Sequence, residues 1–481
     1  MKKICTTITT LSIVFCFGQA NWQYEIIDSV SGAGSHFTFN DIDVDSNGIP
    51  CVVYDRNSFH DLMLACRVDS IWQIEVVESS DFYYGMSIAL DNNNGCHLGY
   101  YRKDTISGIS HLVYAYKDTS SWVFDLIDSC VSPIGNYYLE HKSSIAIDTF
   151  GYPAIAYLTW EETDSIHPLK FAHYNGVSWD ITTVEYDSAY SGNQIAPTDF
   201  SPSLKFKSDN IPFVAYYHVY PSTMSDTLKL AHYVDSLGQW VKDTVACDIY
   251  GGVPVSLDFN NQNQPSIAHI NNSTLVYTWW DNSNWTSDFI DGIGTLHTRI
   301  SLSIDTDNNP HIVYLLWGFY SPKYCYRDTI WHICDTIEPD TAYITFDKDV
   351  SLVTDSEKTS HIVYPFDDFG SSLCGLKYVH GSIVGIEESR MHSIGDSRNF
   401  YVYPSVTSGY VTIGYSVENI GLHRITLYDI TGRKIESLPL GHQSIGLYTE
   451  HIDMSHLDAG VYFIQCFSKD SDGFTKIILV N

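Results

Sequence analysis

Two pairs of adjacent acidic residues are the first candidates for chemistry in this sequence. Glu161 with Glu162, and Asp367 with Asp368, could supply the two carboxylates that cleave a glycosidic bond, one as general acid and one as base or nucleophile. Adjacent acids of this kind also occur at solvated loop tips. The sequence contains no Gly-rich phosphate loop, His-Glu-x-x-His motif or Gly-x-Ser-x-Gly elbow. We therefore assign no catalytic residue, no metal site and no cofactor.

Two arginines could bind a substrate carboxylate. Arg56 and Arg102 each stand two residues after a tyrosine, in segments of the same pattern. A sialidase-like enzyme needs such an arginine cluster, but the Ser-x-Asp-x-Gly-x-x-Trp box of those enzymes is absent here. Residues 43–48 begin like a calcium-binding loop. The twelfth position of that loop is Tyr54 and not a bidentate acid, so we interpret the segment as a turn.

The composition excludes several classes of partner. The 481-residue chain has 57 acidic and 26 basic residues and a formal net charge of -31 at pH 7. Nucleic-acid-binding proteins need a basic surface, and anionic membranes attract basic segments, so neither is expected as a partner. Apolar residues make up 44% and aromatic residues 14% of the chain. Many aromatic residues and few charges favour a β-rich extracellular protein with a packed core.

The N-terminus has the features of a secretory signal peptide. Lys2 and Lys3 form a basic region, residues 4–17 are mostly apolar, and small residues precede a cleavage site after Ala20. The pattern predicts that residues 1–20 are removed. The apolar run is too short and too rich in Thr to span a bilayer, and no later stretch is long and apolar enough. We therefore expect an exported chain without a transmembrane segment.

Nine of the eleven cysteines lie beyond the predicted signal peptide. An odd number leaves at least one without an intramolecular disulfide partner. Their irregular spacing, without a Cys-x-x-Cys pair, argues against a zinc site. Cys51 with Cys66, and Cys325 with Cys334, would lie on neighbouring strands of one sheet. Disulfides are possible there in an oxidising compartment, and buried free thiols are the alternative.

Seven segments repeat one pattern, in which an apolar alternating run, a polar turn and a second apolar run follow one another. The positions that end the turn are Pro50, Cys96, Pro153, Pro212, Pro265, Pro310 and Ser360. The aromatic residues four positions later are Tyr54, Tyr100, Tyr157, Tyr216, His269, Tyr314 and Tyr364. The segments are 45 to 59 residues apart, which is typical of β-propeller blades.

Each unit continues with a third apolar run and, in six units, a fourth. The fourth run opens with Trp72, Trp122, Trp179, Trp240, Trp285 or Trp331. Four alternating runs per unit predict four antiparallel strands, so we expect an all-β fold with a seven-bladed propeller over residues 21–381. The seventh unit lacks its Trp run, and residues 22–28 supply one at the N-terminus. We expect this strand to complete the last blade, which leaves no sheet edge open.

The first turn of each unit is constant in length, as is typical of a scaffold. Its acidic residue is expected to accept backbone N–H bonds within the turn. The residues concerned are Asp45, Asp91, Asp148, Asp305 and Asp355. The units resemble the propeller repeats of secreted bacterial proteins, with the pattern apolar-Asp-x-x-Gly-x-Pro-apolar-Tyr. That resemblance implies the architecture and says little about function.

The loops between the second and third strands vary in length, and in a propeller they emerge on the same face as the blade-to-blade loops. Both sets are rich in aromatic and acidic residues, so we predict a binding surface on this variable-loop face. The alternative is that the aromatic side chains pack against the blades. The candidate ligand-binding residues are Trp160, Glu161, Tyr217, Tyr220, Trp317, Tyr320, Tyr83 and Tyr138.

The composition changes after the last unit. Residues 382–399 form a polar stretch without Phe, Tyr or Trp and are interpreted as a linker. Residues 400–481 contain short alternating runs separated by turns, which predict a small C-terminal β-sandwich. Residues 427–433 (Leu-Tyr-Asp-Ile-Thr-Gly-Arg) and 457–463 (Leu-Asp-Ala-Gly-Val-Tyr-Phe) are followed by a last strand that contains a lysine.

This order of motifs resembles the C-terminal sorting domain of the bacterial type IX secretion system. The resemblance implies that the translocon of that system is a partner, and that the protein is afterwards released or attached to the outer cell surface. The residues that match the motifs are Asp429, Gly432, Arg433, Gly460, Tyr462 and Lys476.

Together these features predict an extracellular or surface-displayed propeller with a sorting domain. We expect it to bind a carbohydrate or a protein through the variable-loop face. The alternatives are a sialidase-like or other glycosidase or lyase that uses the same face, and a structural surface protein. An enzyme requires converging acids with shifted pKa values in a pocket, a binding protein requires exposed aromatic rings, and a structural protein requires neither.

Overall fold

A computed structural model describes residues 22–382 and 400–479, with gaps. The gaps are at 32–36, 57–59, 80, 105, 119–120, 132–141, 160–165, 189–200, 221–224, 250–254, 272–273, 293–298, 316–321, 329–330, 335–336, 338–347, 369–372, 404–405, 408, 418–420, 430–432, 444–445 and 468–471. The predicted signal peptide and most of the predicted linker lie outside the described residues. The chain forms two compact units, which divide between residues 383 and 384. Among the described residues, no helix has the length and apolar character needed to cross a membrane.

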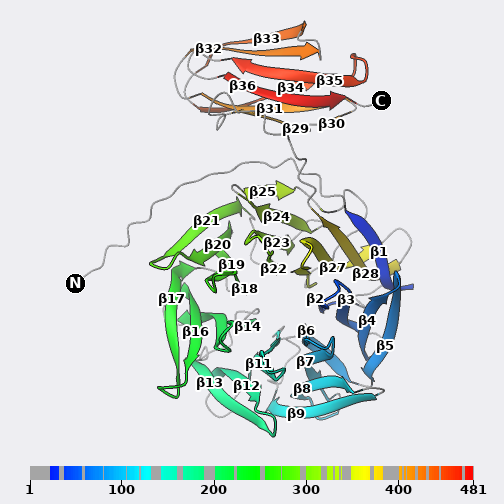
Figure 1. Cartoon of the computed structure of the whole chain (residues 1–481), viewed down its shortest axis with the longest axis vertical. Coiled ribbons are helices and arrows are strands. Elements are labelled where there is room, and N and C mark those ends of the chain that lie inside the picture. Colours follow the sequence, from blue (N-terminus) through cyan, green and yellow to red (C-terminus); the bar gives the residue numbers. More distant parts are fainter. Residues whose placement is uncertain are drawn as a thin grey trace, which may run out of the picture. The chain divides into compact units, whose positions relative to one another are not determined.

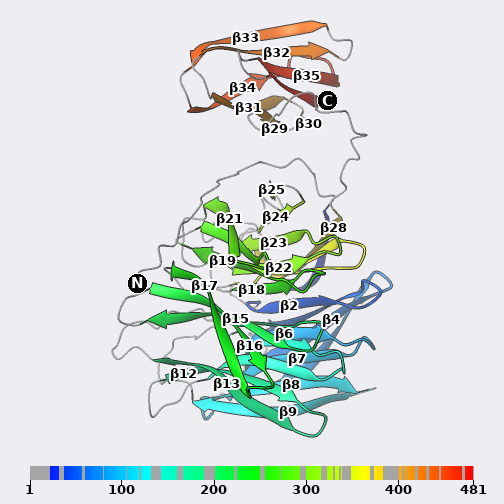
Figure 2. The same ribbon diagram turned by 60° about the vertical axis from the view of Figure 1, so that its left-hand side comes forward.

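Seven four-stranded antiparallel sheets form a ring in the N-terminal unit (Figure 1). Each sheet is one blade, with its first strand innermost, and the twist of the blades is visible in Figure 2. Blades 1 to 3 consist of β2 (Asn40–Val44), β3 (Pro50–Arg56), β4 (Asp61–Val68) and β5 (Ile71–Ser79); β6 (Phe82–Leu90), β7 (Cys96–Lys103), β8 (Ile109–Asp118) and β9 (Ser121–Val131); and β10 (Ser144–Ile147), β11 (Pro153–Leu158), β12 (Ile166–Tyr174) and β13 (Trp179–Ser188).

Blades 4 to 6 follow the same order. They consist of β14 (Ser203–Phe206), β15 (Pro212–Tyr220), β16 (Ser225–Val234) and β17 (Gln239–Ile249); β18 (Ser256–Phe259), β19 (Pro265–Asn271), β20 (Thr274–Trp280) and β21 (Trp285–Gly292); and β22 (Arg299–Ile304), β23 (Pro310–Leu315), β24 (Lys323–Arg327) and β25 (Trp331–Cys334). The seven-bladed propeller predicted from the repeat is confirmed.

Blade 7 is completed by the N-terminal strand. It consists of β26 (Ser351–Thr354), β27 (Thr359–Asp368), β28 (Leu373–Ser382) and β1 (Gln23–Ser31). β1 pairs antiparallel with β28, from Gln23 opposite His380 to Ser31 opposite Leu373. The predicted closure of the ring by residues at the N-terminus is therefore confirmed, and the last blade has no missing strand.

Contacts between neighbouring blades form the core. Buried apolar clusters combine side chains of adjacent blades, as where Leu64 of blade 1 and Leu98 of blade 2 share one cluster. We call the contact region between two neighbouring blades a seam. The tyrosine of the repeat lies in a seam, and its hydroxyl donates to a carboxylate on the outer strand of the preceding blade. The pairs are Tyr54–Asp28 (2.9 Å), Tyr100–Glu78 (2.7 Å), Tyr157–Asp128 (3.0 Å), Tyr216–Glu185 (3.1 Å) and Tyr314–Asp291 (2.8 Å).

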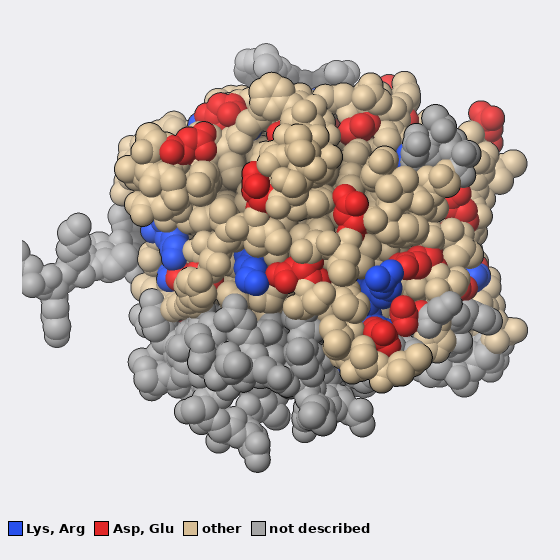
Figure 3. All heavy atoms as spheres, turned by 90° about the horizontal axis from the view of Figure 1, so that it is seen from below, with Lys and Arg blue, Asp and Glu red and all other residues tan. Residues whose placement is uncertain are grey.

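Each of these carboxylates stands six residues after the Trp that opens an outer strand, as Glu78 follows Trp72. A cation also joins most of the pairs, such as Lys170 at 3.1 Å from Asp128. Blade 4 has Ala246 at the position of the acid, and the next blade has His269 in place of the tyrosine. On the face viewed in Figure 3, acidic and basic side chains lie next to one another.

The constant turn of each blade is held by its acidic residue, as predicted. Asp45 Oδ1 accepts the backbone N–H of Asn47 and of Ile49, both at 2.8 Å. The equivalent oxygens of Asp91, Asp148, Asp305 and Asp355 accept the same two bonds. The fourth residue of the turn has a positive φ in all seven blades, which explains why Gly or Asn stands there in six of them and only Lys358 differs.

One of the two cysteine pairs considered forms a disulfide. Cys51 and Cys66 stand opposite one another on β3 and β4 and are joined. Cys325 stands opposite Ile333 in the ladder, and not opposite Cys334. The disulfide therefore ties two strands within blade 1.

The C-terminal unit contains a three-stranded and a five-stranded sheet. Residues that include Ile413, Ile425 and Ile464 form its buried core. The strands are β29 (Phe400–Tyr403), β31 (Tyr410–Val417) and β34 (Gly446–Asp453) in one sheet, and β30 (Val406–Thr407), β36 (Asp472–Leu479), β35 (Gly460–Phe467), β32 (Gly421–Asp429) and β33 (Lys434–Gln443) in the other. This agrees with the small sandwich predicted from the sequence.

Candidate functional site

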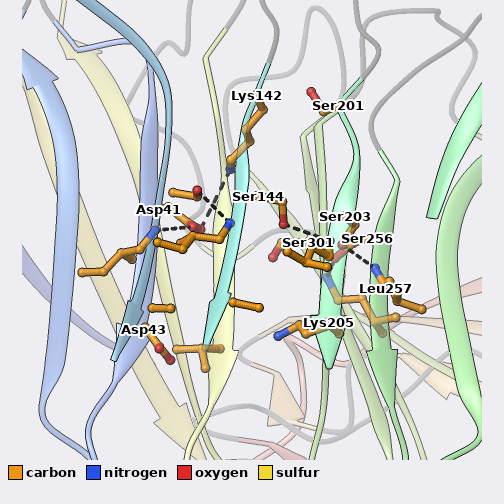
Figure 4. A pocket seen from close by; sticks show the side chains of 18 of the residues that line it. Asp41, Asp43, Lys142, Ser144, Ser201, Ser203, Lys205, Ser256, Leu257 and Ser301 are labelled. Carbon is orange, nitrogen blue, oxygen red and sulfur yellow. Dashed lines mark hydrogen bonds and ion pairs between the residues drawn. The ribbon is translucent and has the colours of Figure 1, made fainter. Parts of the chain in front are cut away.

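The inner strands of all seven blades line a central channel with a cavity of about 340 Å³. Strands alternate their side chains between two faces, so that in β2 Asp41 and Asp43 face the cavity while Ile42 is buried. Polar side chains from several blades converge here (Figure 4). The channel is the candidate functional site of the propeller.

A ring of short polar side chains surrounds the middle of the channel. Six blades carry serine at one equivalent position, and blade 1 carries Asp41 instead. Ser144 Oγ accepts the backbone N–H of Leu204 in the next blade at 2.9 Å, and Asp41 Oδ2 accepts that of Ile88 at 3.1 Å. The same link recurs from Ser87, Ser203, Ser256 and Ser301 to the following blade. These bonds fix the inner strands, so the wall of the channel is preorganised.

Four charged residues cluster at one end of the channel, which we call the loop-side end. Lys142, Arg299 and Asp349 stand where the blade-to-blade connections enter the inner strands, on the same side as the variable loops. Lys142 Nζ lies 3.9 Å from Asp41 Oδ1 and 3.8 Å from Asp349 Oδ2. Arg299 Nε lies 3.2 Å from Asp349 Oδ1. The cluster therefore alternates two carboxylates and two cations around the opening.

The surroundings of Asp41 shift the pKa of its carboxyl group. Burial raises the pKa of Asp41, and the nearby Asp349 acts in the same direction, while Lys142 and the N–H of Ile88 oppose the shift. The ammonium of Lys142 and the guanidinium of Arg299 can donate hydrogen bonds, and the carboxylates of Asp41 and Asp349 can accept them. The loop-side end thus offers both donors and acceptors to a hydroxyl-rich ligand.

The opposite end, which we call the turn-side end, carries a second charged group. Burial raises the pKa of Asp43 to about 6, although its carboxylate accepts the backbone N–H of Leu90 at 2.8 Å. Lys205 extends into the channel from β14 (Figure 4), and the carboxylates of Asp258 and Asp43 raise its pKa. The channel is thus charged at both ends and lined by serine hydroxyls between them.

A buried carboxyl group lies on β3 of blade 1, the strand next to the channel-lining β2. Asp55 is fully buried, and its Oδ1 accepts the backbone N–H groups of Thr38 at 2.9 Å and of Phe39 at 2.6 Å. Burial raises the pKa of Asp55 to about 7, in spite of these bonds. The folded protein therefore binds a proton here that the unfolded chain, with an ordinary aspartate, releases above pH 4.

The pH dependence of stability should reveal this group. Because the folded-state pKa is raised, the contribution of Asp55 to the free energy of unfolding is complete below pH 4 and is lost as the pH rises to 7. We expect Asp55→Asn to gain stability relative to the wild type by about 1.4 kcal/mol per pH unit across that window. Urea unfolding at pH 4.5, 6 and 8 measures this. A stability difference that is constant across the three pH values would show that the carboxyl group is ionised throughout.

The structure places two of the candidate ligand-binding tyrosines inside the blades. Tyr83 and Tyr217 are buried, and the hydroxyl of Tyr217 donates to the carbonyl of Ile270 at 2.9 Å. The expectation that these two rings are exposed on the variable-loop face is therefore wrong. They belong to strands β6 and β15, which extend further toward the loops than the sequence pattern predicted.

The other candidates for ligand binding lie wholly or partly outside the described residues. Tyr220 belongs to β15, but its side chain is not described. The remaining five stand in gaps of the description, so their role stays a prediction. They are Trp160, Glu161, Trp317, Tyr320 and Tyr138.

The charged residues considered for catalysis have structural partners. Arg56 lies 3.5 Å from Asp28 of blade 7, and Arg102 pairs with Glu78 of blade 1, so each arginine lies between two blades and neither lines the channel. The carboxylate of Asp367 is buried and accepts a hydrogen bond from the ammonium of Lys348 at 2.6 Å. Glu161, Glu162 and the side chain of Asp368 lie outside the described residues.

The sequence contained one signal for the channel cluster. Aligned on the turn, Asp41 is the only residue of its position that is not serine. Lys142, Arg299 and Asp349 gave no such signal, because the connections that precede the inner strands differ from blade to blade.

The motif residues of the C-terminal unit stabilise its turns. Asp429 closes the β32–β33 hairpin, since it accepts the backbone N–H of Arg433 at 3.0 Å and pairs with its guanidinium at 2.9 Å. Gly460 is the first residue of β35, and the hydroxyl of Tyr462 donates to the carbonyl of Asp458 at 2.7 Å. Gly432 and the side chain of Lys476 lie outside the described residues.

Residues 401–481 match the model of a family described as a secretion system C-terminal sorting domain. The chain ends in a type IX secretion sorting domain. This domain directs export to the cell surface or the extracellular space, with the type IX machinery as partner. No curated protein is significantly similar to the sequence.

Several solved structures resemble the chain weakly. A polysaccharide lyase, Uly1, is 11% identical with a TM-score of 0.44, over 71% of this chain and 89% of its own. A fucose-specific lectin from Aleuria aurantia is 13% identical with a TM-score of 0.42, over 63% and 96%. PorZ, a surface component of the type IX secretion system of Porphyromonas gingivalis, is 10% identical with a TM-score of 0.26, over 91% and 75%. At these values the likenesses say nothing about function.

Proposed function

We propose that the exported propeller binds a carbohydrate at the loop-side end of its central channel. The observation that supports this most directly is the cluster of Asp41, Lys142, Arg299 and Asp349 on the wall of the cavity. Each sugar hydroxyl can donate and accept a hydrogen bond, and alternating carboxylates and cations complement that chemistry. Carbohydrates are also abundant outside the cell, where this protein is exported.

The shape of the site favours a small ligand over a flat protein surface. Specific protein–protein interfaces bury more than about 1,000 Å², whereas small-molecule sites are concave with a few converging polar groups. A cavity of about 340 Å³ surrounded by seven inner strands belongs to the second kind. We further propose that aromatic residues of the variable loops stack on the sugar rings above the channel. The candidates are Trp160, Tyr220, Trp317, Tyr320 and Tyr138, with Glu161 beside them.

A glycan array with the full mature chain tests this function. We expect specific binding to one class of glycan, and we expect Lys142→Gln to weaken it at least tenfold, because a hydrogen bond from a charged group contributes about 1.5–3 kcal/mol. The matched control is Lys117→Gln, which removes a cation paired with Glu75 on the outer strands, away from the channel. Binding that Lys142→Gln and Lys117→Gln weaken equally, or no glycan binding at all, would contradict the proposal.

A second candidate function is cleavage of the bound carbohydrate. It is favoured by the raised pKa of Asp41 and by Lys142, which stands between the carboxylates of Asp41 and Asp349. A carboxyl group of raised pKa suits a general acid, with the second carboxylate as base or nucleophile. An enzyme of this kind would release reducing ends from the glycan that it binds. Asp41→Asn should then stop cleavage and leave binding within a few-fold of the wild type.

A further inference from the structure

Three cysteines meet in the seam between blades 1 and 2. Cys51 on β3 and Cys66 on β4 form the disulfide, and Cys96, the first residue of β7 in the next blade, is a free thiol. The three sulfur atoms all lie within 4.8 Å of one another. A free thiol at this distance from a disulfide has its attacking atom next to the bond that exchange would break.

Cys96 stands at a position of the repeat where other blades have a different residue. It is the residue that ends the constant turn, which is Pro in five blades and Ser360 in blade 7. Its half-buried side chain packs against the apolar cluster that blades 1 and 2 share, where the half-buried Cys66 also packs. The repeat therefore does not require a cysteine here, and the seam places it against the disulfide.

We propose that Cys96 exchanges with the Cys51–Cys66 disulfide, which gives the propeller a second covalent state with a Cys51–Cys96 bond between blades 1 and 2. Cys96 first loses its proton to water, and a lone pair of its sulfur attacks Cys51 Sγ. The Cys51–Cys66 bond breaks, its electron pair remains on Cys66 Sγ, and that sulfur takes up a proton. One disulfide is present before and after, so no oxidant or reductant is consumed.

The difference in burial between Cys51 and Cys66 decides which of the two sulfur atoms is attacked. Cys51 is buried and Cys66 is half-buried. A thiolate leaves more readily where water stabilises its charge, so Cys66 is the better leaving group and Cys51 the sulfur that is attacked. The new bond joins β3 of blade 1 to β7 of blade 2. It closes a longer loop than the original bond and covalently joins two blades that are otherwise held by packing, hydrogen bonds and ion pairs.

The surroundings of Cys96 set the conditions for exchange. Burial raises the pKa of the Cys96 thiol to about 12, Lys117 opposes this shift, and the carboxylates of Glu75, Asp43 and Asp91 add to it. Only the thiolate attacks a disulfide. The exchange is therefore slow at neutral pH, and its rate should rise about tenfold per pH unit between pH 7 and pH 9.

The first test uses the full chain with Cys66→Ser, incubated in a glutathione redox buffer, alkylated and mapped by mass spectrometry without reduction. We expect a peptide that contains a Cys51–Cys96 bond, while the exposed Cys247 is alkylated and serves as the internal control. Cys66→Ser combined with Cys96→Ser should give no such peptide. Alkylation of both Cys51 and Cys96 in the folded Cys66→Ser protein would overturn the proposal.

The second test follows the wild-type protein and does not depend on the folding of a variant. Samples held at pH 7, 8 and 9 are quenched in acid, alkylated and mapped over time. We expect alkylated Cys66 to accumulate as alkylated Cys96 declines, with rates that rise about tenfold per pH unit. If Cys96 alone is alkylated at every pH and time, the three cysteines do not exchange.

Discussion

Removal of residues 22–31 should prevent the propeller from folding, although it deletes only one strand. β1 pairs with β28 over eight residue pairs, and it also carries side chains that join blade 7 to its neighbours. Asp28 accepts the hydroxyl of Tyr54 in blade 1, and Glu25 pairs with Arg67 at 2.7 Å. The Trp22 ring packs edge-on against Tyr324 of blade 6, with centroids 5.0 Å apart. Without these contacts blade 7 keeps an open edge and two seams lose their links.

The measurement is circular dichroism with thermal unfolding of the shortened chain. We expect loss of the cooperative transition of the propeller. The matched control returns residues 22–31 to the chain behind residue 382 through a short flexible linker, so that the same strand follows β28 directly. This rearranged protein should melt cooperatively. A shortened chain that melts as the wild type does would show that β1 does not close the ring.

A point substitution probes the same strand pair. A side chain at Gly375 on β28 would place its Cβ 2.4 Å from the backbone oxygen of Asp28 on β1 and 2.7 Å from the ring of Phe366. Backbone cannot yield as a flexible side chain can, so Gly375→Ala should destabilise the propeller by about 1–3 kcal/mol. Urea unfolding measures the loss. An unchanged midpoint would mean that β1 is not held against β28 in solution.

Lys348→Met should destabilise the propeller by about 3–5 kcal/mol, the range found when one partner of a buried ion pair is removed. Lys348 is 1% exposed and Asp367 7% exposed, with 2.6 Å between Nζ and Oδ2. Loss of the ammonium removes the cation that pairs with this buried carboxylate. The free energy of unfolding from urea titration, together with Asp367→Leu and the double variant, gives the coupling between the two side chains.

The matched control for this prediction is Lys358→Met. Lys358 pairs with Asp307, and both side chains are largely exposed. An exposed pair contributes less than about 1 kcal/mol, so the control should be close to the wild type. Equal effects of the two lysine variants would show that Lys348 is solvated.

The repeat predicted the fold because each of its residues has a local task. The turn acid accepts two N–H bonds within five residues, so Asp45 and its equivalents are fixed by the turn itself. The seam partners of the tyrosines were not predicted, although Glu78 stands six residues after Trp72. That spacing has meaning only once two units lie side by side, because the acid and the tyrosine belong to different blades and stand 22 to 31 residues apart in the chain.

The site was harder to predict for the same reason. A sequence pattern distinguishes the two faces of a strand, but it does not say which face lines a channel until the ring closes. Lys142 and Asp349 are more than 200 residues apart and meet only because blades 1, 3 and 7 converge on one axis. Tyr83 and Tyr217 were misassigned because tyrosine suits both a loop surface and a buried seam, and strands β6 and β15 include them.

The most direct test of carbohydrate binding at the channel is a crystal structure of the mature protein with the glycan of highest affinity from the array. We expect a sugar ring at the loop-side end, with hydroxyl oxygens within hydrogen-bond distance of Lys142 and Asp41. A glycan bound only at the rim of the blades or to the C-terminal unit, with the loop-side end of the channel occupied by water, would contradict the proposed site.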